Sequence, residues 1–148
     1  EKKLKDYLRA FHYGNEDISA GITQAWLVQP DATGPALKIS AYEQAEFMKA
    51  LWSGVLPASK QAIAMAKDIT YLETSPKGFR LSGKTGSNYY NNSGKKRLGW
   101  FIAHIDNGEK EYVVVTNFSD LVNNTESVYG GVKAKEVTKK ILSDLGLW

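Results

Sequence analysis

Two segments rich in β-branched and aromatic residues, 98–106 and 111–118, flank the dipeptide Asn107-Gly108. Such side chains favour strands because they pack well on a pleated surface. Asn-Gly between two strands is a strong hairpin signal, because both central residues of a type I′ turn need a positive φ. The sequence therefore predicts an antiparallel hairpin that is closed by a two-residue turn at Asn107-Gly108.

Helical spacing dominates the first half of the chain. Apolar residues recur at intervals of three and four over residues 2–11, which predicts a helix there; they are Leu4, Tyr7, Leu8 and Phe11. Ser40 and Glu43 have the spacing of a capping box, in which each side chain satisfies a backbone N–H of the other residue. Ser59 is a typical N-cap residue. Two further helices are therefore expected to begin after Ser40 and Ser59.

The apolar positions of these helices predict which faces are buried. For the helix after Ser40, which Gly54 and Pro57 should end, the predicted buried residues are Ala41, Ala45, Met48, Leu51 and Trp52. For the helix after Ser59 they are Ala62, Met65, Ala66 and Ile69. A last helix has the stripe Ala134, Val137, Ile141, Leu142 and Leu145, with Gly146 where a C-terminal cap is expected.

The remaining segments complete one domain of the α+β class, since 148 residues are the size of an ordinary domain. A strand over 79–87 precedes the hairpin, and 16–38 is expected to be a loop with a short helical piece over 22–27. Three strands and one covering helix make a thin core, so more sheet should belong to the domain than the chain contains. An exposed sheet edge and apolar face would favour a homodimer or a swapped assembly.

The composition excludes several classes of function. The chain has no cysteine, which excludes a disulfide framework and a cysteine-based metal site. Its two histidines, His12 and His104, have no partner pattern, so both are expected to be structural, and no metal site is predicted. The net charge of +3 comes from scattered basic residues, which argues against a nucleic-acid-binding surface. No apolar run approaches the ~20 residues that a membrane span needs.

Lys84-Thr85-Gly86 is the motif that carries chemistry, and it lies at the end of a predicted strand. The lysine ammonium and the threonine hydroxyl can bind an anionic ligand group. The glycine lets a ligand approach the strand edge closely. The next N–H, on Ser87, can point at a developing oxyanion. The alternative is a strand that happens to end in a Lys-Thr-Gly turn and has no chemical role.

Several segments together resemble the class D (oxacillinase-type) serine β-lactamases, in which Lys-Thr-Gly is one signature. The other similar segments occur in the family's order and approximate spacing, from Leu4 to Leu147. They are Tyr13-Gly14-Asn15, Trp26-Leu27, Leu37-Lys38-Ile39-Ser40, Glu43-Gln44 and Gly99-Trp100-Phe101. The resemblance implies the family's fold, an antiparallel sheet flanked by helices with an all-helical lobe. The chain would be the C-terminal part of one such β-lactamase/transpeptidase-like domain.

The resemblance also implies roles for single residues. Lys84, Thr85 and Gly86 match substrate-binding positions, and the Ser87 N–H matches a donor of the oxyanion hole. Trp26 matches a tryptophan that packs over a carbamylated lysine, although a plain core indole is the alternative for this residue. The residues that match the wall of the family's site are Tyr13, Gly14, Asn15, Trp26 and Leu27.

The last helix departs from the family pattern. Class D enzymes place an arginine near its start to bind the substrate carboxylate, and no arginine occurs there in this chain. Lys133 or Lys135 is expected to take its place. Carboxylate binding should then be weaker or arranged differently, because lysine cannot form the planar bidentate pair.

The nucleophile motif departs as well. The family's Ser-x-x-Lys and Ser-x-Val both lie upstream of Tyr-Gly-Asn, and this chain begins about a dozen residues before Tyr13. Ser93-Gly94-Lys95-Lys96 and Ser53-Gly54-Val55 have the right spacings, but they lie in a turn-rich segment and at a helix end. We interpret both as coincidence. The serine nucleophile and the carbamylated lysine are expected in a segment outside this chain, and no other cofactor is implied.

The sequence leaves three functions open. The first is hydrolysis of β-lactam antibiotics by the parent protein through an acyl-serine intermediate. The second is an extracellular sensor domain that β-lactams acylate but that hardly turns them over. The third is a chain that by itself folds or associates without chemistry. The resemblance implies β-lactams as ligands and a location in the bacterial periplasm or outside the cell.

Overall fold

The computed structural model describes residues 1–27, 34–89, 96–124 and 128–148. The helices of the described residues are α1 (Lys2–Ala10), α2 (Ala41–Ser53), α3 (Lys60–Ile69) and α4 (Gly130–Asp144). The strands are β1 (Tyr71–Thr74), β2 (Arg80–Tyr89), β3 (Arg97–Asp106) and β4 (Glu111–Ser119). This order confirms the predicted α+β class.

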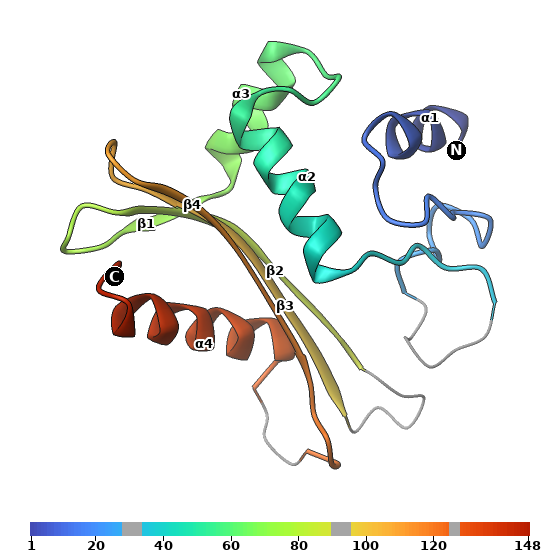
Figure 1. Ribbon diagram of the computed structural model, residues 1–148. Helices are drawn as coiled ribbons and strands as arrows, with labels where there is room; N and C mark the ends of the chain where they lie inside the picture. The colour runs from blue at the N-terminus through green and yellow to red at the C-terminus, as the bar shows by residue number, and fades with distance from the viewer. Residues whose placement is uncertain (28–33, 90–95, 125–127) are drawn as a thin grey trace.

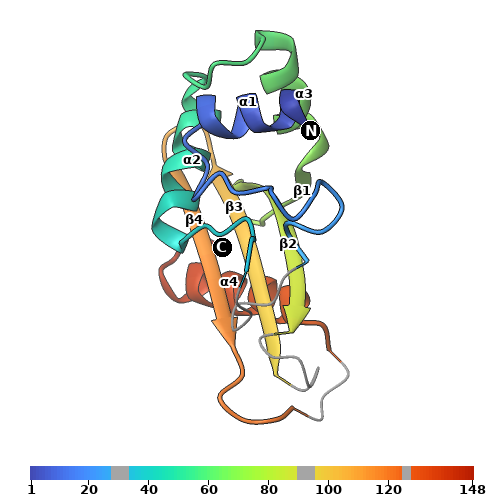
Figure 2. The same ribbon diagram turned by 90° about the vertical axis from the view of Figure 1, so that its right-hand side faces the viewer.

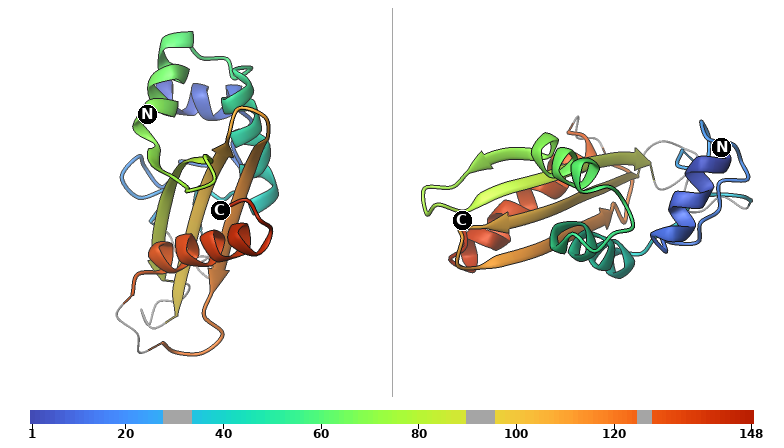
Figure 3. Two further views of the ribbon diagram at one scale, coloured as in Figure 1. Left: turned by 90° about the vertical axis from the view of Figure 1, so that its left-hand side faces the viewer. Right: turned by 90° about the horizontal axis from the view of Figure 1, so that it is seen from above.

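The strands form one antiparallel sheet in the order β1-β2-β3-β4. Helix α4 covers one face of the sheet, and α2 and α3 lie on the other side (Figure 1). Figure 2 looks onto the α2 side, and the left panel of Figure 3 shows α4 crossing in front of the strands. Strand β1 is missing from the prediction because its four residues are mostly exposed and show no buried alternation.

The predicted hairpin forms between β3 and β4, but its turn differs from the prediction. The Asn107 N–H donates to the Lys110 oxygen at 3.2 Å, so Gly108 and Glu109 are the central residues of the turn. Gly108 has a φ of 85°, and Asn107 is not among the residues with positive φ. The prediction of a type I′ turn centred on Asn107-Gly108 is therefore wrong. The Asn107 side chain instead accepts the N–H groups of Glu109 and Lys110 and stabilises the turn from its first position.

The predicted helix starts are confirmed. Ser40 Oγ accepts the Glu43 N–H at 3.2 Å, and Glu43 Oε2 accepts the Ser40 N–H at 2.8 Å, which completes the capping box. Gly54 ends α2 in the left-handed conformation with a φ of 74°. Ser59 Oγ accepts the Ala62 N–H at 3.1 Å and caps α3. These signals are readable from sequence because each involves residues at most four positions apart.

The predicted buried face of α4 is partly wrong. The buried residues of this helix are Gly130, Gly131, Ala134, Thr138 and Leu142. Val137, Ile141 and Leu145 are exposed instead. Thr138 can take a buried position because its hydroxyl lies 2.8 Å from the Ala134 oxygen and 2.7 Å from the Thr116 hydroxyl. A ranking by hydrophobicity places Val137 in the core, whereas the structure places its neighbour Thr138 there.

Helices α2 and α3 depart from the prediction in the same way. In α3, Ile63 is buried while the predicted core residues Met65 and Ile69 are exposed. In α2, Gln44 is buried beside Met48, and it accepts the Tyr13 hydroxyl hydrogen at 2.8 Å. The other predicted core residues of α2, which are Ala41, Ala45, Leu51 and Trp52, are only partly buried. The short helical piece expected over 22–27 is a series of turns.

The main core lies between the sheet and α4. Its buried residues are Phe79, Leu81, Phe101, Ala103, Ile105, Ala134 and Leu142. Leu8, Ile18 and Ala25 form a second, smaller cluster that holds α1 to the following loop. Neither cluster fills the α2 side of the sheet, and the candidate site lies on that side.

A buried ion pair fastens the ends of β3 and β4. Arg97 Nε lies 2.9 Å from Asp120 Oδ2, and the two side chains are 10% and 13% exposed. The Arg97 backbone N–H also donates to this carboxylate, and Arg97 Nη1 donates to the Val128 oxygen just before α4. Hydrogen bonds from Arg97 hold the pKa of Asp120 below its usual value. This pair therefore ties the hairpin to the segment that leads into α4.

We expect Asp120→Asn to destabilise the chain by roughly 1–3 kcal/mol, because the change removes the carboxylate charge that accepts the hydrogen bonds of the Arg97 backbone N–H and Nε. The depressed pKa means that the pair stabilises the chain above the carboxyl's unfolded pKa, and this stability is lost as the pH falls through the folded pKa. Urea unfolding at neutral and acid pH measures both effects. Asp68→Asn, an exposed control on α3, should change stability by less than about 0.5 kcal/mol. Equal losses in the two variants would contradict the prediction.

An apolar row on α4 lies toward the β4 edge of the sheet. Lys135 and Lys139 pair with Glu73 on β1. Val137 and Ile141 each lie two residues later, about 200° further around the helix, and so face the opposite side. Strand β4 is the last strand of the sheet on that side. The edge strand β4 and the exposed apolar row of α4 lie side by side, and such a surface favours the predicted self-association.

We predict that the chain self-associates and that Ile141→Lys weakens the association by placing a charge in the apolar row. Val132→Lys is a matched control, because Val132 is 46% exposed, Ile141 is 47% exposed, and the two lie on opposite sides of α4. Sedimentation velocity over a concentration series measures the association. A monomeric wild-type chain, or equal effects of the two variants, would rule this surface out.

Candidate functional site

The two faces of β2 serve different purposes. Leu81 lies in the core with α4, and the Ser87 hydroxyl oxygen accepts the Gly131 N–H of α4 at 2.8 Å. Because side chains alternate along a strand, Thr85 shares this face, while Lys84 and Gly86 face the α2 side. The Lys-Thr-Gly motif thus presents its lysine and its glycine together and turns its threonine toward α4.

The far half of β2 has an edge without a neighbouring strand. On the β1 side, the Gly83 N–H donates to the Thr70 oxygen at 2.8 Å, and no described strand pairs with β2 beyond that point. Backbone groups point to the same edge at every second residue, so those of Thr85 and Ser87 face the open edge. Lys84 Nζ donates to the Thr85 oxygen at 2.6 Å and therefore lies at this edge too. An ammonium and a backbone N–H are thus both available to an anionic or carbonyl group.

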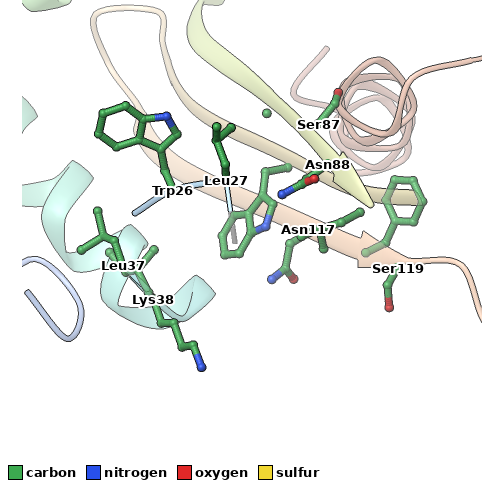
Figure 4. A pocket seen from close by; sticks show the side chains of 13 residues that line it. Trp26, Leu27, Leu37, Lys38, Ser87, Asn88, Asn117 and Ser119 are labelled. Carbon is green, nitrogen blue, oxygen red and sulfur yellow. The ribbon is translucent and has the colours of Figure 1, made fainter. Parts of the chain in front are cut away.

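A cavity of about 710 Å³ opens beside this strand on the α2 side of the sheet (Figure 4). Its sheet wall includes Gly86, Ser87 and Trp100, and its loop wall includes Trp26 and Leu27. The indole of Trp26 and the side chain of Leu27 stand over the strands in the close view. The cavity therefore brings together four predicted site residues, Trp26, Leu27, Gly86 and Ser87, from segments about 60 positions apart.

Trp26 and Leu27 are 52% and 56% exposed. The alternative for Trp26, a plain core indole, is therefore wrong for this chain. The pair is placed by backbone contacts of the residue before it, since the Ala25 N–H donates to Gly21 and the Leu37 N–H donates to Ala25. An exposed apolar pair held by ordered backbone is available to cover a ligand or another segment of protein.

Tyr13-Gly14-Asn15 supports the loop wall from behind and does not itself line the cavity. Asn15 Oδ1 accepts the Lys38 N–H at 2.8 Å, Asn15 Nδ2 donates to the Ala36 oxygen, and the Asn15 N–H donates to the Lys38 oxygen. Gly14 has a φ of 54°, and a Cβ at this position would lie 2.0 Å from the same Lys38 oxygen. Residues 13–15 therefore fix the extended segment that carries Leu37 into the cavity.

Tyr13 links this support to α2. Its hydroxyl donates to Gln44 Oε1 at 2.8 Å, and its ring packs edge-on against Phe47 with centroids 5.0 Å apart. Burial raises the pKa of the Tyr13 hydroxyl above its ordinary value. The hydroxyl is therefore a fixed hydrogen-bond donor rather than a source of charge.

The predicted carboxylate-binding lysines lie away from the cavity. Lys135 Nζ lies 3.0 Å from Glu73 Oε1, and Lys133 Nζ lies 3.6 Å from Glu136 Oε2 on the same helix. The hydrogen bonds from Lys139 and Lys135 hold the pKa of Glu73 below its usual value. Their role in binding a carboxylate, like the roles of Lys84 and Thr85, stays a prediction.

Several polar or aromatic residues of the cavity were not predicted as site residues, among them Trp100, Asn88 and Asn117. Trp100 lies opposite Gly86 in the sheet register, and Asn88 and Asn117 line the same cavity. A Cβ at Gly86 would lie 3.5 Å from the Trp100 Cβ, so the missing side chain leaves the indole room. Strand alternation could have found Trp100 and Asn117, because both lie on the face of their strands opposite the core.

Among the described residues, the remaining candidates show no arrangement for catalysis. Ser53 lies exposed at the end of α2, where its hydroxyl donates to the Lys49 oxygen, and residues 93–95 of the other serine motif lie outside the described residues. His104 is buried against Trp52, with ring centroids 3.7 Å apart, and its Nε2 lies 2.6 Å from Glu111 Oε1. Across the described residues, no three His, Cys, Asp or Glu side chains are placed to hold a metal.

Comparison with known proteins places these features in one family. The family model described as "Penicillin binding protein transpeptidase domain" matches residues 1–143. The sequence is 35% identical over 147 residues to "Probable beta-lactamase YbxI" of Bacillus subtilis (strain 168), an alignment that covers 99% of this chain and 48% of that protein. The chain thus spans about half the length of this relative.

Solved structures agree with the sequence comparison. "Class D beta-lactamase BAT-2" superposes with a TM-score of 0.79 at 34% identity, over 100% of this chain and 54% of that chain. The "C-terminal domain of the Bacillus licheniformis BlaR penicillin-receptor" superposes with a TM-score of 0.83 at 29% identity, again over 100% and 54%. The expected β-lactamase/transpeptidase fold is confirmed. No helix within the described ranges has the length and apolar character of a membrane span.

We expect Gly14→Ala to destabilise the chain by more than about 2 kcal/mol, because the substitution combines a left-handed backbone with an overlap onto the Lys38 backbone. Gly54→Ala is the matched control, since Gly54 also has a positive φ but an added methyl group there would meet nothing within 4 Å. That control should cost about 1 kcal/mol. Denaturant unfolding measures both variants. A Gly14→Ala variant as stable as Gly54→Ala would contradict the supporting role of this motif.

Proposed function

The chain belongs to the penicillin binding protein transpeptidase domain family, and from this membership we propose that it forms the substrate-binding wall of a serine site that reacts with β-lactams. One arrangement carries the proposal: the Ser87 N–H and the Lys84 ammonium both face the open edge of β2, beside the cavity that Trp26 also lines. A β-lactam offers a carbonyl and a carboxylate, which are the groups that such an edge can bind.

In this proposal, the β-lactam carbonyl lies against the edge of β2 and its oxygen accepts the Ser87 N–H. That donor becomes more valuable as the serine attacks, because negative charge builds up on the oxygen. Lys84 binds the substrate carboxylate at the open edge, whereas Thr85, whose side chain faces α4, contributes to that edge through its backbone. Gly86 lets the ring approach the strand, since no side chain stands between them.

The groups that make and break bonds are proposed to come from outside these 148 residues. The only Ser-x-x-Lys spacing in the chain is at 93–96, in a turn-rich segment, whereas a nucleophile needs a base held beside it. In our proposal the parent protein supplies the serine and a carbamylated lysine, and this chain supplies recognition and the oxyanion donor. No metal or organic cofactor enters the proposed reaction.

Hydrolysis of β-lactams is the proposed overall reaction, because relatives named as β-lactamases align along nearly the whole chain. A sensor domain that is acylated without turnover is the second candidate. The superposition on the domain named as a BlaR penicillin-receptor favours it specifically. Either function would place the protein where β-lactams arrive, in the bacterial periplasm or outside the cell.

Nitrocefin turnover by the parent protein tests the first candidate, and we expect steady hydrolysis. A parent that forms a stoichiometric, long-lived acyl adduct by mass spectrometry, without turnover, would establish the sensor instead. A parent with an intact Ser-x-x-Lys that neither acylates nor hydrolyses would refute both. The isolated chain serves as control, and we expect no covalent adduct with labelled penicillin on any of its serines.

A further inference from the structure

The start of α4 meets β2 and β3 at three glycines, Gly99, Gly130 and Gly131. A Cβ at Gly99 would lie 2.2 Å from the Gly130 oxygen, and one at Gly130 would lie 2.5 Å from the Leu98 oxygen. A Cβ at Gly131 would lie 2.7 Å from the Gly86 oxygen and 2.9 Å from Ser87 Oγ. Each of these distances is too short for a real contact, so the helix start touches the two strands backbone to backbone.

One polar contact fixes the alignment of this junction. The Gly131 N–H donates to Ser87 Oγ at 2.8 Å. The side chain of Ser87 therefore points to α4, while its own N–H points to the open edge of β2. On its other side the same residue pairs with Gly99 in the sheet register. Ser87 is thus held by the sheet and by α4 at once.

We propose that the Ser87 hydroxyl and Gly131 are positioning residues, which set the direction of the Ser87 N–H through the start of α4. This inference rests on the proposed function, since it concerns the donor of the same site. In a strand end without a neighbour on one side, the local twist is free to vary. The hydrogen bond from Gly131 removes that freedom where the N–H must meet the developing oxyanion.

The geometry required of such a donor is strict. An oxyanion donor acts at about 2.7–3.1 Å from the oxygen that it stabilises. A misplacement of about 1 Å can cost about a hundredfold in rate. A hydroxyl at this position therefore contributes to the reaction without touching substrate, because it holds its own residue in place.

Ser87→Ala removes the acceptor of the Gly131 N–H, and Ser87→Thr keeps it. Ser143→Ala, on an exposed turn of α4, is the control. In the 148-residue chain, amide hydrogen exchange by NMR should show that the protection of Gly131 falls at least about tenfold in Ser87→Ala only. The protection of Phe101, in the core, reports any global loss of stability, so that a merely less stable variant is recognised.

In the parent protein, the acylation rate constant with a β-lactam should fall by about tenfold to a hundredfold in Ser87→Ala, and Ser87→Thr should restore it. Unchanged Gly131 protection in Ser87→Ala would overturn the proposal. So would lost protection with an unchanged acylation rate, which would leave the proposed function standing. A wild-type parent that no β-lactam acylates would remove the proposed function and the positioning role together, while Gly131 protection would still report whether the bond exists.

Discussion

Helix α4 docks onto the sheet through a backbone contact with β2 and β3 that is too close for a side chain to fit between them. Gly99, Gly130 and Gly131 let helix and strand backbones touch, and a methyl group at any of them would overlap a carbonyl group. From this contact α4 runs across the sheet and buries Ala134 and Leu142 in the main core. The same contact brings the Gly131 N–H to Ser87. The core and the candidate oxyanion donor are therefore aligned by one close approach.

The candidate site is assembled from two walls that are built independently. The sheet wall is the far half of β2, where the β1 neighbour has ended and backbone groups face outward. The loop wall carries Trp26 and is held by Asn15, whose side chain bonds the backbone at Ala36 and Lys38. Among the described residues, neither wall contains an activated nucleophile. The chemistry that the site suits is recognition and charge stabilisation, which agrees with the role proposed for it in a larger site.

The two candidate functions use this site in the same way. Both begin with acylation of a serine, which needs the substrate held and the oxyanion stabilised. They differ in whether water then removes the acyl group, and that step depends on a base that activates water. No residue of the two walls is placed as such a base among those described. The two walls are proposed to bind the substrate and stabilise the oxyanion, and the base that would activate water is not among their described residues. We therefore expect the same walls in relatives named as β-lactamases and in the relative named as a penicillin-receptor.

The sequence by itself determined the features that depend on a few neighbouring residues. The caps at Ser40 and Ser59, the position of the hairpin and the strand that contains Lys84-Thr85-Gly86 are of this kind, because their hydrogen bonds and periodicity are local. Only the tertiary structure decided which faces are buried. Thr138 takes the core position predicted for Val137 because the glycine contacts set the orientation of α4. A prediction from the hydrophobicity of neighbouring residues cannot include a backbone contact between residues over 30 positions apart. The meeting of Trp26 with Gly86 has the same origin, since long-range packing alone brings these segments together.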